Sequence, residues 1–249
     1  MKFKIFNLKL KLATHTVIGY PNLKTSEKIV SVLAQYSQII ELQIPFSDPV
    51  ADGPVIAKAN YRAVDGGVTP QDCLKFAAKV AQQNPETDFY FMSYYNSIFH
   101  FGITKFVKAA QAAGVQGFIV PDLPVEEADE LLAACRENKL SLIFVIAPNT
   151  SEITLKKIAV AAHGWIYCVA RLGITGSQTE FGKNLKKILT RVKRFTPLPL
   201  GVGFGVKSRK DIQQIAKAGG TIGIVGSELF RQFEKGGLKK LEQFLKSLN

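Results

Sequence analysis

The chain has 249 residues, of which 47% are hydrophobic and 21% are charged. This composition supplies enough apolar side chains for a sizeable core, and it excludes a disordered tail, a collagen-like fibre and a small disulfide-stabilised protein. The formal net charge is +12, which by itself would favour nucleic acid or an anionic surface as the partner.

Short β-rich runs alternate with amphipathic segments along the whole chain. The predicted strands cover residues 14–18, 39–44, 88–93, 117–120, 142–146, 165–169, 198–202 and 221–225. The predicted helices cover residues 26–37, 70–83, 103–113, 125–138, 151–162, 183–195, 208–218 and 237–248. Two helices have clear start signals, a proline at the first helical position after Thr69 and a capping serine at Ser151.

Eight strands, each followed by a helix, in a chain of this length predict a (β/α)8 TIM barrel that spans residues 1–249 as a single domain. A doubly wound open sheet is the alternative fold. No GxGxxG sequence opens the first predicted helix, so the barrel is favoured.

The positive charge is concentrated in two stretches that contain no acidic residue. Residues 1–26 hold five lysines and residues 181–210 hold nine lysines and arginines, so these fourteen residues exceed the whole net charge of +12. In the second stretch, Leu185, Leu189 and Val192 recur at helical spacing with lysines between them. This pattern favours a solvated basic helix face over a nucleic-acid groove, and we expect no nucleic-acid partner.

The sequence also indicates the cellular compartment. No run of about 18 apolar residues is present, and lysines interrupt the first twelve residues, where a secretory signal would be continuously apolar. Cys73, Cys135 and Cys168 include no CxxC pair and are expected to be buried thiols. We therefore expect a cytoplasmic protein with no membrane partner.

Two carboxylates are the first candidates for chemistry. Glu41 stands inside an apolar predicted strand, where a carboxylate is costly unless it has a partner or a purpose. Asp52 follows eleven residues later in a proline-rich loop. Carboxylates in such different surroundings can take different acid–base roles, as expected at the C-terminal end of a barrel. The alternative is an ion-paired core residue and a turn-forming aspartate.

Other patterns concern metal, anion and lid sites. The three histidines have no metal-ligand spacing, so we expect no metal site. Glycines follow the seventh strand at 201–205 and the eighth at Gly226, next to a predicted helix start. They favour a phosphate site, with ordinary turns as the alternative. The loop 171–177 has the composition of a lid that excludes water, or of a plain solvent loop.

The segment ELQIPFSDPVADGP, residues 41–54, resembles the signature of the tryptophan synthase alpha chain family. Further segments also resemble that family in the right order along nearly the whole chain: MSYYNSI (92–98), PDLPVEEA (121–128), RLGITG (171–176), GVGFGV (201–206) and VGSEL (225–229). The resemblance implies a carbon–carbon lyase of tryptophan biosynthesis. Its reaction is the retro-aldol cleavage of indole-3-glycerol phosphate to indole and glyceraldehyde 3-phosphate.

The resemblance also implies roles for individual residues. Glu41 matches the acid–base glutamate, which protonates ring C3 and later accepts the glycerol hydroxyl proton. Asp52 matches the aspartate that accepts a hydrogen bond from the indole N–H. Tyr167 matches a substrate-site tyrosine, and Thr175 matches a threonine of the lid. The family's phosphate-binding positions match Gly176, Gly205, Gly226 and Ser227.

A partner is implied as well. The family works with a pyridoxal-phosphate beta subunit, which receives indole through a tunnel, in an alpha2beta2 heterotetramer. The alpha chain itself is expected to carry no cofactor. Segments 45–54 and 92–102 match the loops that face this partner.

Three residues depart from the family pattern. Gln43 replaces a glycine two residues after Glu41, on the same interior face, and is expected to crowd the substrate or to hydrogen-bond Glu41. Gln43 is the main reason to consider an alternative, a catalytically impaired subunit that binds a phosphate ligand and activates the beta chain. Tyr20 and Ser97 replace an aspartate and a proline near the expected partner face.

Overall fold

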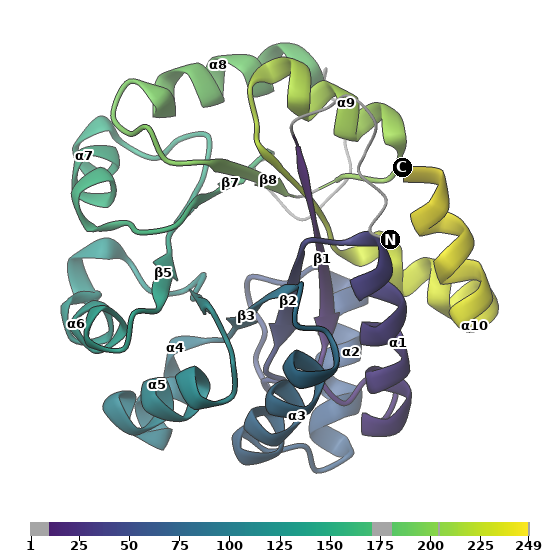
Figure 1. Ribbon diagram of the computed structural model, residues 1–249. Coiled ribbons are helices and arrows are strands. Elements are labelled where there is room, and N and C mark those ends of the chain that lie inside the picture. Colours follow the sequence, from purple (N-terminus) through teal and green to yellow (C-terminus); the bar gives the residue numbers. More distant parts are fainter. Residues whose placement is uncertain (1–9, 171–180, 204, 249) are drawn as a thin grey trace.

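The computed structural model describes residues 10–170, 181–203 and 205–248. Parallel strands surround a central axis, and the helices form a ring outside them (Figure 1). The sheet order is β5-β4-β3-β2-β1-β9-β8-β7-β6, and every paired strand is parallel to its neighbour. This arrangement confirms the predicted TIM barrel. Its strands are β1 (Lys11–Val17), β2 (Ile39–Gln43), β3 (Asp88–Met92), β4 (Gly117–Ile119), β5 (Ser141–Ile143), β6 (Val145–Ile146), β7 (Ile166–Val169), β8 (Leu200–Gly203) and β9 (Ile222–Val225).

The described strands number nine because one predicted strand is divided. The predicted run 142–146 forms β5, which pairs with β4, and β6, which pairs with β7. Phe144 lies between them, and its carbonyl oxygen accepts a hydrogen bond from the Tyr167 N–H at 3.0 Å. β5 and β6 are therefore both the two ends of the sheet order and neighbours in the chain. The ring of eight predicted strands is interrupted only at Phe144, between them.

Most predicted helices are confirmed within a few residues: α1 (Leu23–Tyr36), α3 (Pro70–Gln83), α5 (Ile103–Ala112), α6 (Asp129–Glu137), α7 (Glu152–Ala161), α8 (Phe181–Lys193) and α9 (Arg209–Ala218). The short helix η1 (Val125–Glu127) precedes α6. Both start signals are confirmed, because Thr69 forms a capping box with Asp72 and the Ser151 side chain accepts from the Thr154 N–H.

Three helical segments were missed. They are α2 (Pro54–Asp65), α4 (Tyr95–Phe101) and the first half of α10 (Ser227–Leu248). α2 buries only Ala59, Asn60 and Ala63, which are small or polar. The larger apolar side chains of α2 that pack against them, Val55 and Ile56, lie in its first turn and are only partly buried, so its apolar stripe is weak. Within α10, Gly236 and Gly237 are not helical, so the predicted segment 237–248 is its second half.

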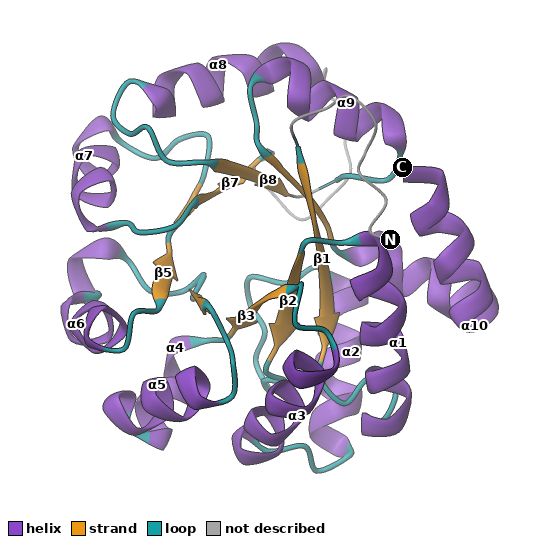
Figure 2. Ribbon diagram, viewed as in Figure 1, coloured by secondary structure: helices purple, strands orange, loops and turns teal. Residues whose placement is uncertain are grey.

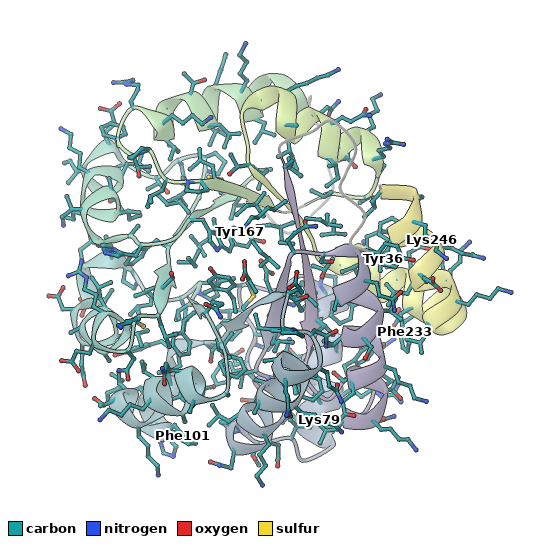
Figure 3. All side chains as sticks on the ribbon, viewed as in Figure 1. Tyr36, Lys79, Phe101, Tyr167, Phe233 and Lys246 are labelled. Carbon is teal, nitrogen blue, oxygen red and sulfur yellow. The ribbon has the colours of Figure 1, made fainter. Side chains whose placement is uncertain are left out.

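The strands form an inner ring and the helices an outer ring (Figure 2). Buried apolar side chains form one layer between sheet and helices, one layer inside the barrel, and a smaller cluster around Val17, Tyr20 and Phe230. Figure 3 shows Tyr167 within the ring of strands, whereas Lys79 and Lys246 lie on the outer helices. The interior layer is made of alternate strand residues, as expected for a barrel. It contains Ala13, Ile39, Tyr90, Met92, Ile119, Ile143, Trp165, Tyr167, Ile222 and Ile224.

The predictions on thiols and on the basic helix are confirmed. All three cysteines are free and buried, and burial raises the pKa of Cys135 and of Cys168 to about 12. In α8, Leu185, Leu189 and Val192 are buried, whereas the lysines between them are exposed. Among the described residues, no helix has both the length and the hydropathy needed to cross a membrane.

Candidate active site

Glu41 lies in the middle of β2, and its side chain shares the barrel interior with those of Ile39 and Gln43 because strand residues alternate between faces. It is 1% exposed. The register places it opposite His15 of β1 and Tyr90 of β3. The sequence prediction of a buried carboxylate in the barrel is confirmed.

The two oxygens of Glu41 have different surroundings. Oε2 lies 3.0 Å from Nδ1 of His15. Oε1 is buried and has no hydrogen-bond partner in the described part of the chain. A buried polar atom without a partner is rare and calls for an explanation, and at the C-terminal end of a barrel the natural explanation is contact with a ligand.

Asp52 lies in the loop after β2 and is half-buried. Its Oδ2 accepts hydrogen bonds from Gln43 Nε2 at 2.7 Å and from the Tyr94 hydroxyl at 3.1 Å. The loop is held at two further points, since the Ala51 N–H donates to the Tyr94 hydroxyl at 2.9 Å and the Phe46 N–H donates to Asn60 Oδ1 at 3.0 Å. Asp52 is therefore fixed by side chains of β2, α2 and the end of β3.

Gln43 does not hydrogen-bond Glu41, contrary to one of the two expectations from the sequence. Its amide oxygen lies 2.8 Å from His15 Nε2, and its amide nitrogen donates to Asp52. The side chain thus spans the distance between a histidine of β1 and the loop aspartate, and it is fully buried there.

Tyr167, on β7, is buried in the barrel interior. Burial, and then the negative charges of Glu41 and Asp52, raise the pKa of its hydroxyl well above 10. The hydroxyl is therefore protonated at neutral pH, and it lies within the electrostatic influence of both carboxylates.

The glycines of β8 make room for aromatic rings. A Cβ atom on Gly203 would lie 2.2 Å from the Tyr167 hydroxyl oxygen, and one on Gly201 would lie 2.6 Å from the Trp165 ring. The two glycines therefore allow Trp165 and Tyr167 to fill the barrel interior beside β8. The sequence interpretation that they let a ligand approach the backbone stays a prediction.

A Gly203→Ala substitution is expected to destabilise the protein by about 1–3 kcal/mol, because the added methyl group must displace the Tyr167 ring in a packed interior. Denaturant unfolding measures the change. Gly226→Ala is the matched control, since its Cβ would meet only Ile56 at 3.7 Å and His15 at 3.9 Å, which are ordinary contacts. Equal stability of the two variants would contradict the steric role of Gly203.

The predicted phosphate positions are partly described. Gly205 follows β8 with a φ of +100°, Gly226 follows β9, and Ser227 is the first residue of α10. Because β8 pairs with β9, the three lie at adjacent strand ends. Arg231, which the sequence analysis missed, donates to Ser227 Oγ at 3.2 Å and pairs with Glu228 at 3.3 Å. Thr175 and Gly176 lie outside the described residues.

Tyr20 does not lie on an open surface. It is 4% exposed, its ring packs against Phe230 at 5.6 Å, and its hydroxyl donates to Glu234 at 3.0 Å. Burial and this hydrogen bond raise the pKa of Tyr20 to about 12. Tyr20 therefore connects β1 to α10, whereas Ser97 is half-buried in α4.

His15 and Tyr94 are the residues that sequence reasoning missed. His15 was weighed only as a metal ligand, yet it alternates with Ala13 and Val17 on β1, a pattern that points to the interior. Tyr94 lies two residues after the end of β3, in the region where barrel active-site residues gather.

Taken together, the fold and the two carboxylates are those of a TIM barrel with a candidate acid–base site at its C-terminal strand ends. A family model described as tryptophan synthase alpha chain matches residues 7–249. The chain therefore belongs to the tryptophan synthase alpha chain family, as the resemblance implied.

Curated relatives and solved structures agree with this assignment. A tryptophan synthase alpha chain from Syntrophotalea carbinolica is 45% identical over 98% of this chain and 96% of its own length. One from Methanocaldococcus jannaschii is 42% identical over 91% of this chain and 82% of its own. A tryptophan synthase complex from Pyrococcus furiosus contains a chain with a TM-score of 0.86 and 31% identity, with 96% of this chain and 97% of that chain covered. A tryptophan synthase structure from Mycobacterium tuberculosis has a TM-score of 0.89 and 33% identity, with coverage of 96% and 91%.

Proposed function

We propose that this chain catalyses the retro-aldol cleavage of indole-3-glycerol phosphate to indole and glyceraldehyde 3-phosphate. One observation carries the proposal: the buried Glu41 Oε1 has no hydrogen-bond partner in the described chain. The same site contains Asp52, which hydrogen bonds from Gln43 and Tyr94 hold in its loop. The proposed substrate is the one that the resemblance to the family implies, and membership of that family supports it.

In the proposed reaction the carbon–carbon bond breaks once the indole ring can accept its electrons. Glu41 protonates ring C3 and so creates this electron sink. Asp52 accepts the indole N–H through Oδ1, which has no hydrogen-bond partner among the described residues, and its charge stabilises the cationic ring. The Glu41 carboxylate then accepts the proton of the glycerol hydroxyl as the bond cleaves, and the neutral Tyr167 hydroxyl lies near both carboxylates.

The phosphate of the substrate is proposed to bind at Gly205, Gly226 and Ser227. The first N–H groups of α10 and the positive end of its dipole favour an anion there. Arg231, one turn further along, donates to Ser227 Oγ while its charge is paired with Glu228. Thr175 and Gly176 are proposed to complete the lid and the phosphate site.

We also propose a beta subunit as partner, in an alpha2beta2 heterotetramer in the cytoplasm. Pyridoxal phosphate is assigned to that partner, and the proposed alpha reaction uses only side chains of this chain. Val50 is 68% exposed and Phe99 is 60% exposed, and they lie in the two segments, 45–54 and 92–102, that resemble partner-facing loops.

The proposal is tested by steady-state cleavage of indole-3-glycerol phosphate by the isolated chain, and then with the beta subunit of a related tryptophan synthase. Indole is expected to be released slowly by the chain alone and faster in the complex, because the partner favours the closed site. Absence of indole in both assays would contradict the lyase function. Activation of the beta subunit without any cleavage would instead identify the regulatory alternative.

A further inference from the structure

A continuous chain of hydrogen bonds connects the two carboxylates of the site. His15 is buried on β1, its Nδ1 lies 3.0 Å from Glu41 Oε2, and its Nε2 lies 2.8 Å from Gln43 Oε1. Gln43 Nε2 in turn donates to Asp52 Oδ2 at 2.7 Å. The order of groups is Glu41, His15, Gln43 and Asp52, and we call the two central side chains the His15–Gln43 bridge.

The direction of the hydrogen bonds in this bridge follows from Asp52. An ionised carboxylate only accepts hydrogen bonds, so the amide nitrogen of Gln43 must face Asp52 and the amide oxygen must face His15. The reversed amide would place two oxygens 2.7 Å apart with no proton between them. Because the amide oxygen only accepts, His15 must carry a proton on Nε2.

The proton on Nε2 leaves only two arrangements for a hydrogen bond between His15 and Glu41. Either Nδ1 also carries a proton and Glu41 is a carboxylate, or Nδ1 accepts a hydrogen bond from a protonated Glu41. Both arrangements contain one proton between Nδ1 and Oε2. Oε1 takes part in neither, in agreement with its lack of a partner in the described chain.

We propose that His15 is a positioning residue for Glu41, and that the His15–Gln43 bridge keeps one proton shared between His15 Nδ1 and Glu41 Oε2 while Oε1 is left for the substrate. The catalytic role of the bridge rests on the proposed function, whereas its protonation pattern does not. Each turnover takes one proton from the pair and returns one. The shared proton passes to Glu41, whose carboxyl group turns about its Cγ–Cδ bond and gives the proton to ring C3. The carboxylate then accepts the proton of the substrate hydroxyl as the carbon–carbon bond breaks, and the reverse turn brings that proton back to His15 Nδ1.

The surroundings of His15 favour retention of this proton. Burial alone would lower the pKa of His15, but the hydrogen bond and charge of Glu41, the charge of Asp52 and the hydrogen bond to Gln43 together raise it above 6.5. The side chains of α10 that surround His15 are apolar, and the Phe230 ring centroid lies 6.0 Å from that of His15. Because the folded chain binds the proton more tightly than the unfolded chain does, the pair stabilises the fold fully below about pH 6.5, and this stabilisation is lost as the pH rises through the raised pKa.

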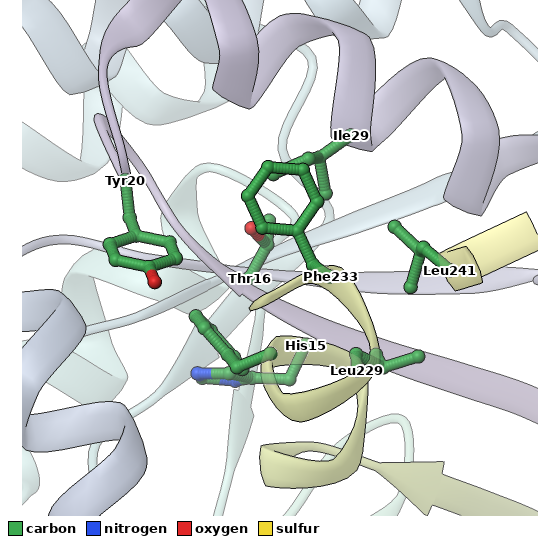
Figure 4. A pocket seen from close by; sticks show the side chains of 8 residues that line it. His15, Thr16, Tyr20, Ile29, Leu229, Phe233 and Leu241 are labelled. Atoms are coloured by element: carbon green, nitrogen blue, oxygen red, sulfur yellow. The ribbon is translucent and has the colours of Figure 1, made fainter. Parts of the chain in front are cut away.

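The side of His15 towards α10 is closed by packing. His15 is part of the wall of a small cavity, together with Ile29 of α1 and with Leu229, Phe233 and Leu241 of α10, while Tyr20 lies at one edge (Figure 4). The cavity volume is about 10 Å³, which is at most the space of one water molecule. Apolar walls and this small volume leave little room for water beside His15, so Glu41 and Gln43 remain the hydrogen-bond partners of its ring.

The protonation pattern is measured directly by nitrogen NMR of the intact chain labelled at histidine. His15 is assigned by its absence in a His15→Asn variant, and the exposed His100 and His163 serve as internal references. We expect Nε2 of His15 to stay protonated between pH 5 and pH 9 (about the range in which histidines titrate), while Nδ1 alone changes. In Gln43→Ala the neutral ring is expected to move its proton to Nδ1. A neutral His15 protonated on Nδ1 in the parent chain would overturn the proposal.

The catalytic part is tested by the pH dependence of kcat in the same His15→Asn variant. Asparagine can still donate to Glu41 Oε2 but does not titrate, so the basic limb of the profile is expected to move to lower pH by at least about one unit. His163→Asn, on the surface, is the matched control and is expected to leave the profile unchanged. A His15→Asn profile that is lowered equally at all pH values would show a merely structural role and overturn the proposal. If the parent chain cleaves no substrate, the proposed function fails, whereas the NMR result still decides whether the bridge exists.

Discussion

A Glu41→Gln variant is expected to fold like the parent chain and to cleave indole-3-glycerol phosphate at least about 1000-fold more slowly, which is within the range that general acid–base groups contribute. Glutamine keeps the shape of the side chain, and its amide can donate to Nδ1 of a neutral His15, so the contact at 3.0 Å is retained. It has no proton to deliver to ring C3 and no charge with which to accept the hydroxyl proton. The loss is therefore expected in kcat, with little change in thermal unfolding.

The surface substitution Glu137→Gln is the control for this variant, because Glu137 is exposed on α6 and far along the chain from the site residues. It makes the same chemical change without touching the barrel interior, and its kcat should equal that of the parent chain. A Glu41→Gln variant that retains kcat within tenfold would exclude Glu41 as the acid and base.

The fold could be predicted from the sequence because the patterns that indicate its strands and helices are local. Buried strands such as residues 39–43 and 88–92 are short apolar runs, and the helices between them carry an apolar stripe with caps such as Ser151. Where the apolar stripe is weak, as in α2, the helix was not predicted. The position of Glu41 was readable for the same local reason, since a single carboxylate in an apolar run is conspicuous.

The bridge between the carboxylates was not readable because it depends on strand register. His15 and Glu41 are 26 positions apart, and His15 and Gln43 are 28 apart. Only the pairing of β1 with β2 brings them together. A slip of one residue would turn His15 out of the barrel, and nothing local in the sequence fixes that pairing. The glycines at positions 201 and 203 pose the same problem. They are needed because the Trp165 and Tyr167 rings, just before and in the neighbouring strand β7, occupy the space that a side chain would fill.

An Asp52→Asn variant is expected to lose about 100-fold or more in kcat, by analogy with the removal of one preorganised charge-stabilising group. The structure gives a reason beyond the lost charge. Oδ2 accepts from both Gln43 and Tyr94, so the oxygen of the new amide must take that place. Its NH2 group then occupies the position of Oδ1 and faces the indole N–H, donor against donor. Steady-state cleavage measures the loss, and Asp65→Asn, exposed at the end of α2, is the control.

A double-mutant cycle separates the misdirected amide from the lost charge. Without the Gln43 side chain, the amide introduced by Asp52→Asn can turn its oxygen towards the substrate, since the Tyr94 hydroxyl can accept as well as donate. Asp52→Asn is therefore expected to cost at least about tenfold less in a Gln43→Ala background than in the parent chain, an interaction energy of about 1.4 kcal/mol. Equal costs in both backgrounds would mean that Gln43 does not orient residue 52, and the loss would then be due to charge alone. A smaller cost would make Gln43 the residue that decides which oxygen of Asp52 meets the substrate.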